Sequence, residues 1–109
     1  MQYCGNLKNR MAKQILPGVR LRTMWGDKML LASVEVDANT VVPPHTHPHE
    51  QGGTVVAGTM DLTIPGETRR LVAEDVYIIP GGVEHSVTTG ETPVRLLEIF
   101  SPVREEYKF

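Results

Sequence analysis

Three of the four histidines in this 109-residue chain fall within the pentapeptide His45-Thr46-His47-Pro48-His49. On an extended backbone, residues two positions apart point to the same side, so His45 and His47 can present two imidazoles to one ion. The preceding Pro43-Pro44 pair favours the extended conformation that this requires. Imidazole nitrogen is a common ligand of zinc, copper, iron and nickel. The spacing therefore predicts a metal site.

Two residues farther along the chain can join this pair. Gln51 lies four residues after His47, across a predicted turn, and His85 directly follows the tight turn at Pro80-Gly81-Gly82, at the start of a predicted strand. Antiparallel strands that close into a barrel bring distant segments together, so His85 can lie beside the first two histidines. A third imidazole from a separate strand would turn a ligand pair into a metal-binding cluster.

Turn-forming residues divide the chain into short segments of β-rich composition, and these segments must position the candidate ligands. The predicted strands are Val19–Trp25, Met29–Val36, Thr54–Val56, Met60–Ile64, Val76–Ile79 and Val94–Phe100. No segment sustains the apolar period of a helix beyond a turn or two. Many short strands with Gly and Pro between them predict an all-β sandwich or barrel, with residues 2–16 forming a short helix or an arm.

Two spaced motifs resemble those of the cupins, G-x5-H-x-H-x3,4-E-x6-G followed by G-x5-P-x-G-x2-H-x3-N. Here the first motif runs from Asn39 to Gly58 and the second from Glu74 to Thr89. Gln51 stands at the Glu position of the first motif. Asn39 replaces its leading Gly, and after glycine asparagine best tolerates a left-handed turn conformation.

The resemblance covers residues 18–104 and implies a small single-domain cupin. The implied fold is a cupin β-barrel, also called a double-stranded β-helix or jelly roll. We expect one domain over residues 1–109, with an arm or short element over residues 1–17 and the barrel over 18–104. The resemblance also implies that one divalent metal ion is bound by three imidazoles and one amide, from His45, His47, Gln51 and His85.

Two neighbouring side chains compete with these ligands. Glu50 is charged and is intrinsically a better metal ligand than Gln51, but it is out of register with His47 and faces away if Gln51 faces inward. His49 shares the odd-numbered phase of the histidine pair, but Pro48 turns the chain first. We therefore expect His49 either to be exposed to solvent or to hydrogen-bond to one of the residues that coordinate the metal ion.

The amide in place of a carboxylate has an electrostatic consequence. Three imidazoles and one amide are neutral, so the full +2 charge of a divalent ion remains. Such an ion is a stronger Lewis acid and a better anchor for an anion. This favours a carboxylate-bearing substrate, or activation of water, over redox cycling. The donor set does not rank Zn, Ni, Mn, Fe and Cu.

Glu98 lies in the last predicted strand, where both faces are apolar. One orientation places its carboxyl group inside the barrel, where burial would raise its pKa and suit it to general acid–base chemistry. The other places it on the solvent face, paired with Arg95 or another surface cation. The alternation of the strand alone leaves both orientations open.

Residues 98–106 resemble the closing segment D-x-F-S-P-P-R-E-D of the KdgF family of pectin-degradation cupins, and residues 45–51 also look like that family. KdgF proteins open the ring of 4,5-unsaturated monouronates to the linear keto form. The resemblance implies that Glu98 and Arg104 are catalytic and that Phe100 and Arg104 bind substrate. Here Glu98 replaces Asp and Val103 replaces the second Pro. The alternative for Arg104 is a solvated surface cation.

We therefore expect a metal-dependent enzyme that acts on a small, anionic, carboxylated sugar. The alternatives are an Fe(II)-dependent cupin dioxygenase, which the neutral ligand set favours less, and a non-catalytic small-molecule-binding cupin. The resemblance also implies a homodimer, in agreement with the strand edges that a small barrel exposes.

The composition is that of an ordinary globular protein. The chain has 11 Lys and Arg residues and 13 Asp and Glu residues. This balance gives no positive electrostatic field that would attract nucleic acid or an anionic membrane. The first ten residues lack the apolar stretch of a secretory signal, and Cys4 has no partner for a disulfide. We expect a cytoplasmic protein in which Cys4 is an incidental thiol.

Overall fold

The computed structural model describes residues 3–109, so the first two positions of the expected N-terminal arm lie outside the described residues. The described residues form ten strands and two short 3₁₀ helices in this order: η1 (Leu7–Asn9), β1 (Lys13–Leu16), β2 (Val19–Trp25), β3 (Leu30–Val36), β4 (Val41–His45), β5 (Glu50–Ala57), β6 (Met60–Ile64), β7 (Glu67–Leu71), β8 (Val76–Ile79), β9 (His85–Thr88), β10 (Val94–Ser101) and η2 (Glu105–Tyr107).

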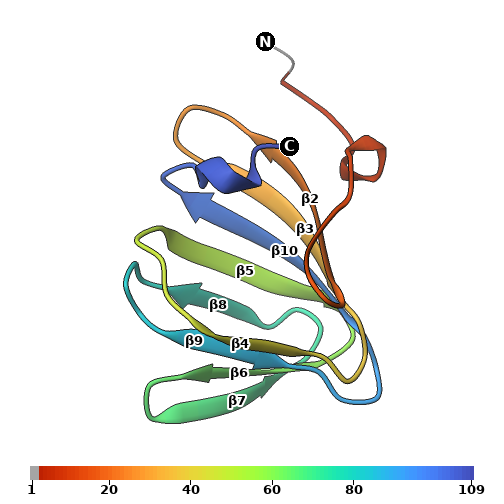
Figure 1. Ribbon diagram of the computed structural model, residues 1–109, viewed down its shortest axis with the longest axis vertical. Coiled ribbons are helices and arrows are strands. Elements are labelled where there is room, and N and C mark those ends of the chain that lie inside the picture. The colour runs from red at the N-terminus through yellow and green to blue at the C-terminus, as the bar shows by residue number, and fades with distance from the viewer. Residues whose placement is uncertain (1–2) are drawn as a thin grey trace.

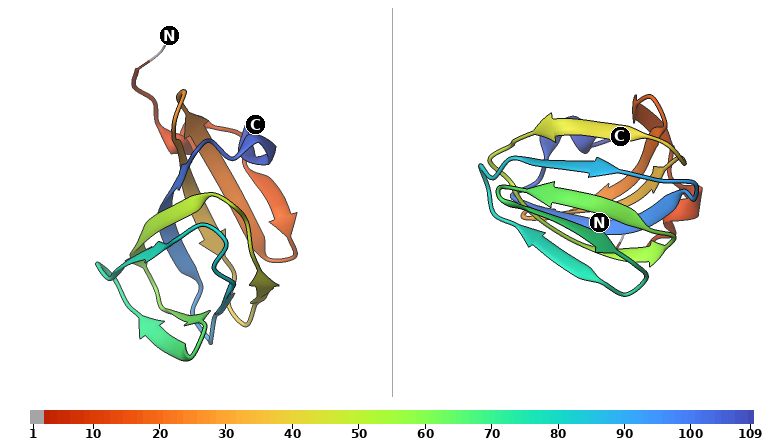
Figure 2. Two further views of the ribbon diagram at one scale, coloured as in Figure 1. Left: turned by 90° about the vertical axis from the view of Figure 1, so that its left-hand side faces the viewer. Right: turned by 90° about the horizontal axis from the view of Figure 1, so that it is seen from below.

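The strands form two antiparallel sheets that face one another (Figures 1 and 2). The six-stranded sheet has the order β1-β2-β3-β10-β5-β8, and the four-stranded sheet has the order β4-β9-β6-β7. Strands that are distant in sequence are neighbours in both sheets, which is the jelly-roll arrangement. The predicted all-β cupin fold is confirmed. In residues 3–109, no helix has both the length and the apolar character needed to cross a membrane.

The strands that sequence analysis missed or shortened have weak local signals. Strands β1, β4 and β7 lie at sheet edges, and β7 is almost entirely exposed, so its side chains show no alternation. Strand β5 was predicted only over Thr54–Val56 but begins at Glu50, because pairing with β10 and β8 on either side overrides the disfavour of Gly52 and Gly53 for strands. Residues 7–16 form a short 3₁₀ helix and a strand.

Strand β10 lies in the middle of the six-stranded sheet, between β3 and β5. Its side chains alternate without exception between buried and exposed, and the buried set includes Leu96, Glu98 and Phe100. The pairing register places Glu98 opposite Ala32 on β3 and opposite Gly53 on β5. Glu98 is therefore flanked by two of the smallest residues. Two positions earlier in β10, Leu96 is flanked by the aliphatic residues Val34 and Val55.

Two outer positions of the cupin motifs have left-handed backbone conformations. Asn39 has φ of 53° and Glu74 has φ of 75°. The left-handed conformation inferred for Asn39 from the motif is thus observed. Glu74 occupies the corresponding glycine position of the second motif, and a residue with a Cβ is strained there.

Replacing Glu74 with glycine should remove this strain. We expect Glu74→Gly to raise the free energy of unfolding by about 0.5–1 kcal/mol, the left-handed penalty less the extra chain entropy of glycine. Chemical denaturation of the purified variants measures the change. Glu74→Ala is the matched control, because it removes the carboxylate but keeps the Cβ, and it should not stabilise. Equal effects of the two substitutions would contradict the explanation.

Candidate metal centre and adjoining pocket

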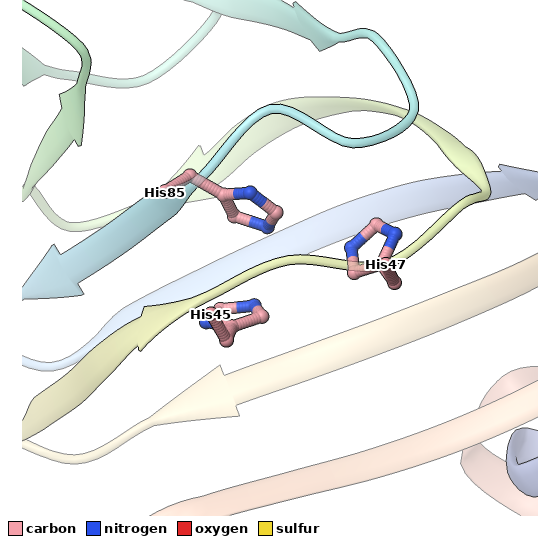
Figure 3. Close-up of side chains that lie close together, drawn as sticks. All are labelled: His45, His47 and His85. Carbon is pink, nitrogen blue, oxygen red and sulfur yellow. The ribbon is translucent and has the colours of Figure 1, made fainter.

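Three imidazoles converge at one end of the space between the sheets. His45 ends β4, His47 lies two residues farther in the connection to β5, and His85 begins β9, which pairs with β4 at His45 (Figure 3). The ring centroids of His45 and His85 are 4.2 Å apart, and those of His47 and His85 are 5.0 Å apart. One nitrogen from each ring lies within 4.8 Å of the other two. His85, which follows the turn at Pro80-Gly81-Gly82, thus lies beside His45 and His47, as predicted.

The same local hydrogen bond orients each imidazole. The Nδ1 atoms of His45, His47 and His85 lie 2.9, 3.0 and 2.9 Å from the carbonyl oxygens of Pro43, His49 and Val83. A carbonyl only accepts, so Nδ1 must carry the proton in all three rings. In a neutral ring, Nε2 is then a bare lone pair. Hydrogen bonding at the far nitrogen is the arrangement that orients histidine ligands of metal ions.

Among residues 3–109, no proton donor satisfies the Nε2 lone pairs of His47 and His85. His85 Nε2 is buried and has no hydrogen-bond partner in that part of the chain. His47 Nε2 lies 3.0 Å from Oε1 of Gln51, so two acceptors face one another. Burial lowers the pKa of both His47 and His85, which keeps their rings neutral near pH 7. A divalent cation would satisfy all of these atoms, so the donor set suits a metal ion.

Glu98 fixes the orientation of the Gln51 amide. Gln51 Nε2 donates a 2.7 Å hydrogen bond to Glu98 Oε2, and a carboxylate offers only acceptors to it. The amide oxygen therefore turns toward the histidines. Gln51 is buried and Glu50 is exposed, in agreement with the register argument that preferred Gln51.

The carboxyl group of Glu98 lies inside the barrel, which settles its orientation. The residue is 7% exposed, and Oε2 accepts a second hydrogen bond, of 2.6 Å, from the hydroxyl of Tyr77. Burial raises the pKa of Glu98, and the hydrogen bonds from Tyr77 and Gln51 and the charge of Arg104 oppose that rise. The described residues make no hydrogen bond to Oε1. That oxygen is left for another partner.

Arg104 is held by aromatic rings and is not a solvated surface cation. Its side chain is 14% exposed, with the guanidinium carbon 4.1 Å from the ring centroid of Tyr107 and 5.2 Å from that of Phe100. Its Nε lies 3.5 Å from a carboxylate oxygen of Glu106 but makes no hydrogen bond to any of the described residues. Cation–π stacking thus orients a guanidinium whose hydrogen-bonding capacity is partly unused.

A single cavity of about 70 Å³ unites these groups. At its polar end it is lined by His45, Gln51, His85, Glu98, Phe100, Arg104 and Tyr107. At its other end it is lined by aliphatic side chains of both sheets, among them Val34, Val36, Val87 and Leu96. The predicted catalytic and substrate-binding residues therefore share one pocket with two of the three histidines.

Two participants escaped sequence analysis. Tyr77 lies in the short, wholly apolar strand β8, where alternation does not show which face is buried. The paired glycines at positions 52 and 53 in a strand were the available signal, because they indicate close approach of another group. Tyr107 lies in η2, beyond the predicted strands. His49, which we expected to be exposed or to hydrogen-bond to a ligand, is half-buried, and its backbone carbonyl accepts the hydrogen bond from Nδ1 of His47.

Comparison with known proteins agrees with this fold. Residues 32–100 match the family described as Cupin domain. The chain is a cupin. This cupin is 31% identical over 84 residues to the pectin degradation protein KdgF of Dickeya dadantii (strain 3937), covering 76% of each chain. It is 41% identical over 70 residues to the H2HPP isomerase of Bacillus subtilis, covering 62% of this chain but 29% of that protein.

A solved structure gives the same relationship. The structure of KdgF from Halomonas sp. superimposes with a TM-score of 0.84 at 27% identity, covering 91% of this chain and 94% of the other. The resemblance to the KdgF family drawn from the motifs is thereby confirmed. The Dickeya dadantii relative is named for pectin degradation, and the Bacillus subtilis relative is named as an isomerase.

The contact between Gln51 and Glu98 predicts a specific effect of charge. In metal-free protein, Gln51→Glu would place two carboxylates within hydrogen-bond distance, so the pair would retain a proton at a raised pKa. We expect the variant to lose about 1–3 kcal/mol of unfolding free energy at pH 8 and to regain stability as the pH falls and the pair takes up that proton.

The exchanged pair is the matched control. Combining Gln51→Glu with Glu98→Gln restores one donor and one acceptor, and we expect recovery of most of the lost stability. Denaturation of chelator-treated protein at two pH values measures both effects. A single variant as stable as wild type at pH 8 would show that the amide does not bridge these groups.

Proposed function

We propose that this cupin is a metal-dependent enzyme that opens 4,5-unsaturated monouronates to their linear keto form. His45, His47, His85 and the amide oxygen of Gln51 would hold one divalent ion, which supplies Lewis-acid polarisation when bound. The observation that carries the proposal is the shared cavity, in which histidines, Glu98, Phe100 and Arg104 line one space.

The residues of the chain suit the proton transfers of this reaction. Ring opening removes the proton of the anomeric hydroxyl and breaks the bond between C1 and the ring oxygen. The resulting enolate becomes a ketone at C5 when C4 gains the proton that the hydroxyl lost, so the reaction is an isomerisation without a further reactant. Glu98 has one oxygen held by two hydrogen bonds and another that none of the described residues occupies. That second oxygen would accept and return the proton.

Arg104 would orient the substrate. A guanidinium presents two parallel donors that match a carboxylate, and stacking on Tyr107 and Phe100 already restricts its motion. With the uronate carboxylate paired to Arg104, the sugar would extend toward the histidines along the polar side of the cavity. Little side-chain entropy would then be lost on binding.

The test uses unsaturated monouronates prepared from pectin and alginate. Decay of the absorbance of the conjugated double bond should be faster with metal-loaded protein than with chelator-treated protein. We expect Glu98→Gln to lower kcat at least about 100-fold. Arg104→Lys, which loses bidentate pairing, should raise KM about 10-fold.

The exposed Arg69 on β7 gives a control, because Arg69→Lys changes a cation outside the cavity and should leave the rate unchanged. No acceleration by the metal-loaded protein with any unsaturated uronate would reject the proposed reaction. Binding of uronates without turnover would indicate a non-catalytic cupin, and oxygen uptake with Fe(II) would indicate a dioxygenase.

We also propose that two copies pair through the outer face of the six-stranded sheet. Val76 and Ile78 on β8 are 74% and 73% exposed, and Leu97 and Ile99 on β10 are also exposed. The register places Thr54 between Val76 and Leu97, and Gly52 between Ile78 and Ile99, so these side chains form one apolar patch across three strands. A contiguous patch of this kind is typical of an interface.

A charge in this patch should separate the copies. We expect wild-type protein to elute with the mass of a dimer in size-exclusion chromatography with light scattering, and Ile78→Lys to elute as a monomer. Val72→Lys, at an exposed apolar position outside this patch, is the control and should leave the mass unchanged. A monomeric wild-type protein at micromolar concentration would reject the pairing.

A further inference from the structure

One row of inward-facing residues crosses the six-stranded sheet at the level of Glu98. Paired positions place Thr23 beside Ala32, Ala32 beside Glu98, Glu98 beside Gly53, and Gly53 beside Tyr77. Tyr77 is thus two strands away from Glu98, with a glycine between them. Its hydroxyl nevertheless reaches Oε2 of Glu98 at 2.6 Å. The ring must therefore lie across the intervening strand.

Gly53 makes this reach possible. A Cβ at position 53 would lie 2.5 Å from Cζ of Tyr77 and 2.8 Å from Cε2, which is closer than any real contact. Its backbone is not in the left-handed region, so an alanine would fit the strand locally and the ring would have to move. Gly53 is therefore needed for the space that it leaves, which the aromatic ring of Tyr77 fills.

Two hydrogen bonds and one close contact connect Tyr77 to the histidine cluster. Tyr77 donates to Glu98 Oε2, the same oxygen accepts from Gln51 Nε2 at 2.7 Å, and Gln51 Oε1 lies 3.0 Å from His47 Nε2. Burial raises the pKa of the Tyr77 hydroxyl, so it remains a proton donor. Each of the two hydrogen bonds to Glu98 has only one direction in which donor and acceptor match, and the facing acceptors Gln51 Oε1 and His47 Nε2 are left for a shared cation.

We propose that Tyr77 is a positioning residue of the metal centre. Its hydroxyl holds the Glu98 carboxylate, and through it the amide of Gln51, so that the amide oxygen faces the three imidazoles. Gly53 is the permissive partner that lets the ring lie across the sheet. This inference rests on the proposed role of Gln51 as a metal ligand, but it does not depend on the identity of the substrate.

The first test measures Co²⁺ binding by the full-length protein in competition with a colorimetric chelator. Loss of hydrogen bonds that orient metal ligands commonly lowers metal affinity by about 10–100-fold. We expect Tyr77→Phe, which keeps the ring, to weaken Co²⁺ binding about 10-fold and to shift the visible absorption bands of the bound ion. Tyr3→Phe removes an exposed tyrosine hydroxyl and should change neither quantity.

The second test asks whether Gly53 acts through Tyr77. Gly53→Ala should weaken Co²⁺ binding about as much as Tyr77→Phe. In a Tyr77→Ala background the Cβ has no ring to displace, so Gly53→Ala should add little further loss. Thermal unfolding by circular dichroism confirms that each variant compared is folded at the assay temperature.

The outcomes separate this inference from the proposed reaction. Unchanged Co²⁺ affinity and an unchanged spectrum in folded Tyr77→Phe would overturn the positioning role. Additive losses of Co²⁺ affinity from Gly53→Ala and Tyr77→Ala would also overturn it. Absence of Co²⁺ binding by wild-type protein would overturn it together with the metal assignment. Wild-type protein that binds Co²⁺, with weakened binding in Tyr77→Phe but no turnover of uronates, would support the positioning role and reject the reaction.

Discussion

The buried carboxylate of Glu98 is the constraint around which the centre of this barrel is arranged. A carboxyl group inside a protein is costly unless hydrogen bonds satisfy it, and here Tyr77 and Gln51 both donate to one of its oxygens. Satisfying it requires a glycine beside it on β5 and a tyrosine one strand farther. It also turns the Gln51 amide, so one buried acid determines which atom faces the histidines.

The fold and the three-histidine cluster were predictable because their signals are local. Motif spacing located His45, His47 and His85, and turn residues separated most of the strands. The hydrogen bonds of Glu98 were not predictable, because they join residues 21 and 47 positions apart and depend on the pairing register of β10, β5 and β8. The strand containing Glu98 is apolar on both faces, so its orientation was settled by three-dimensional packing.

The cavity is divided between a polar end and an aliphatic end, and this division affects the charges in it. Val34, Val36 and Leu96 close the space beneath Glu98, and Phe100 and Tyr107 border it near Arg104. The fully buried Thr23 donates a 2.6 Å hydrogen bond to the carbonyl of Tyr107, which holds the C-terminal segment against the sheet. In such surroundings the effective dielectric constant is low, so interactions among Glu98, Arg104 and an anionic ligand are stronger than in water.

The hydrogen bonds that orient the imidazoles are short in sequence, since each Nδ1 contacts a carbonyl only two positions away. The orientation of each ring relative to its own backbone therefore does not depend on a hydrogen bond to a distant strand. The part of the wall that contains Phe100 and Arg104, neither of which hydrogen-bonds to Gln51, can diverge through point mutations while the local hydrogen bonds of the histidines persist. This independence would allow the scaffold to acquire new substrate selectivity in single steps, and it makes the three short histidine segments suitable for grafting onto another β-sheet protein.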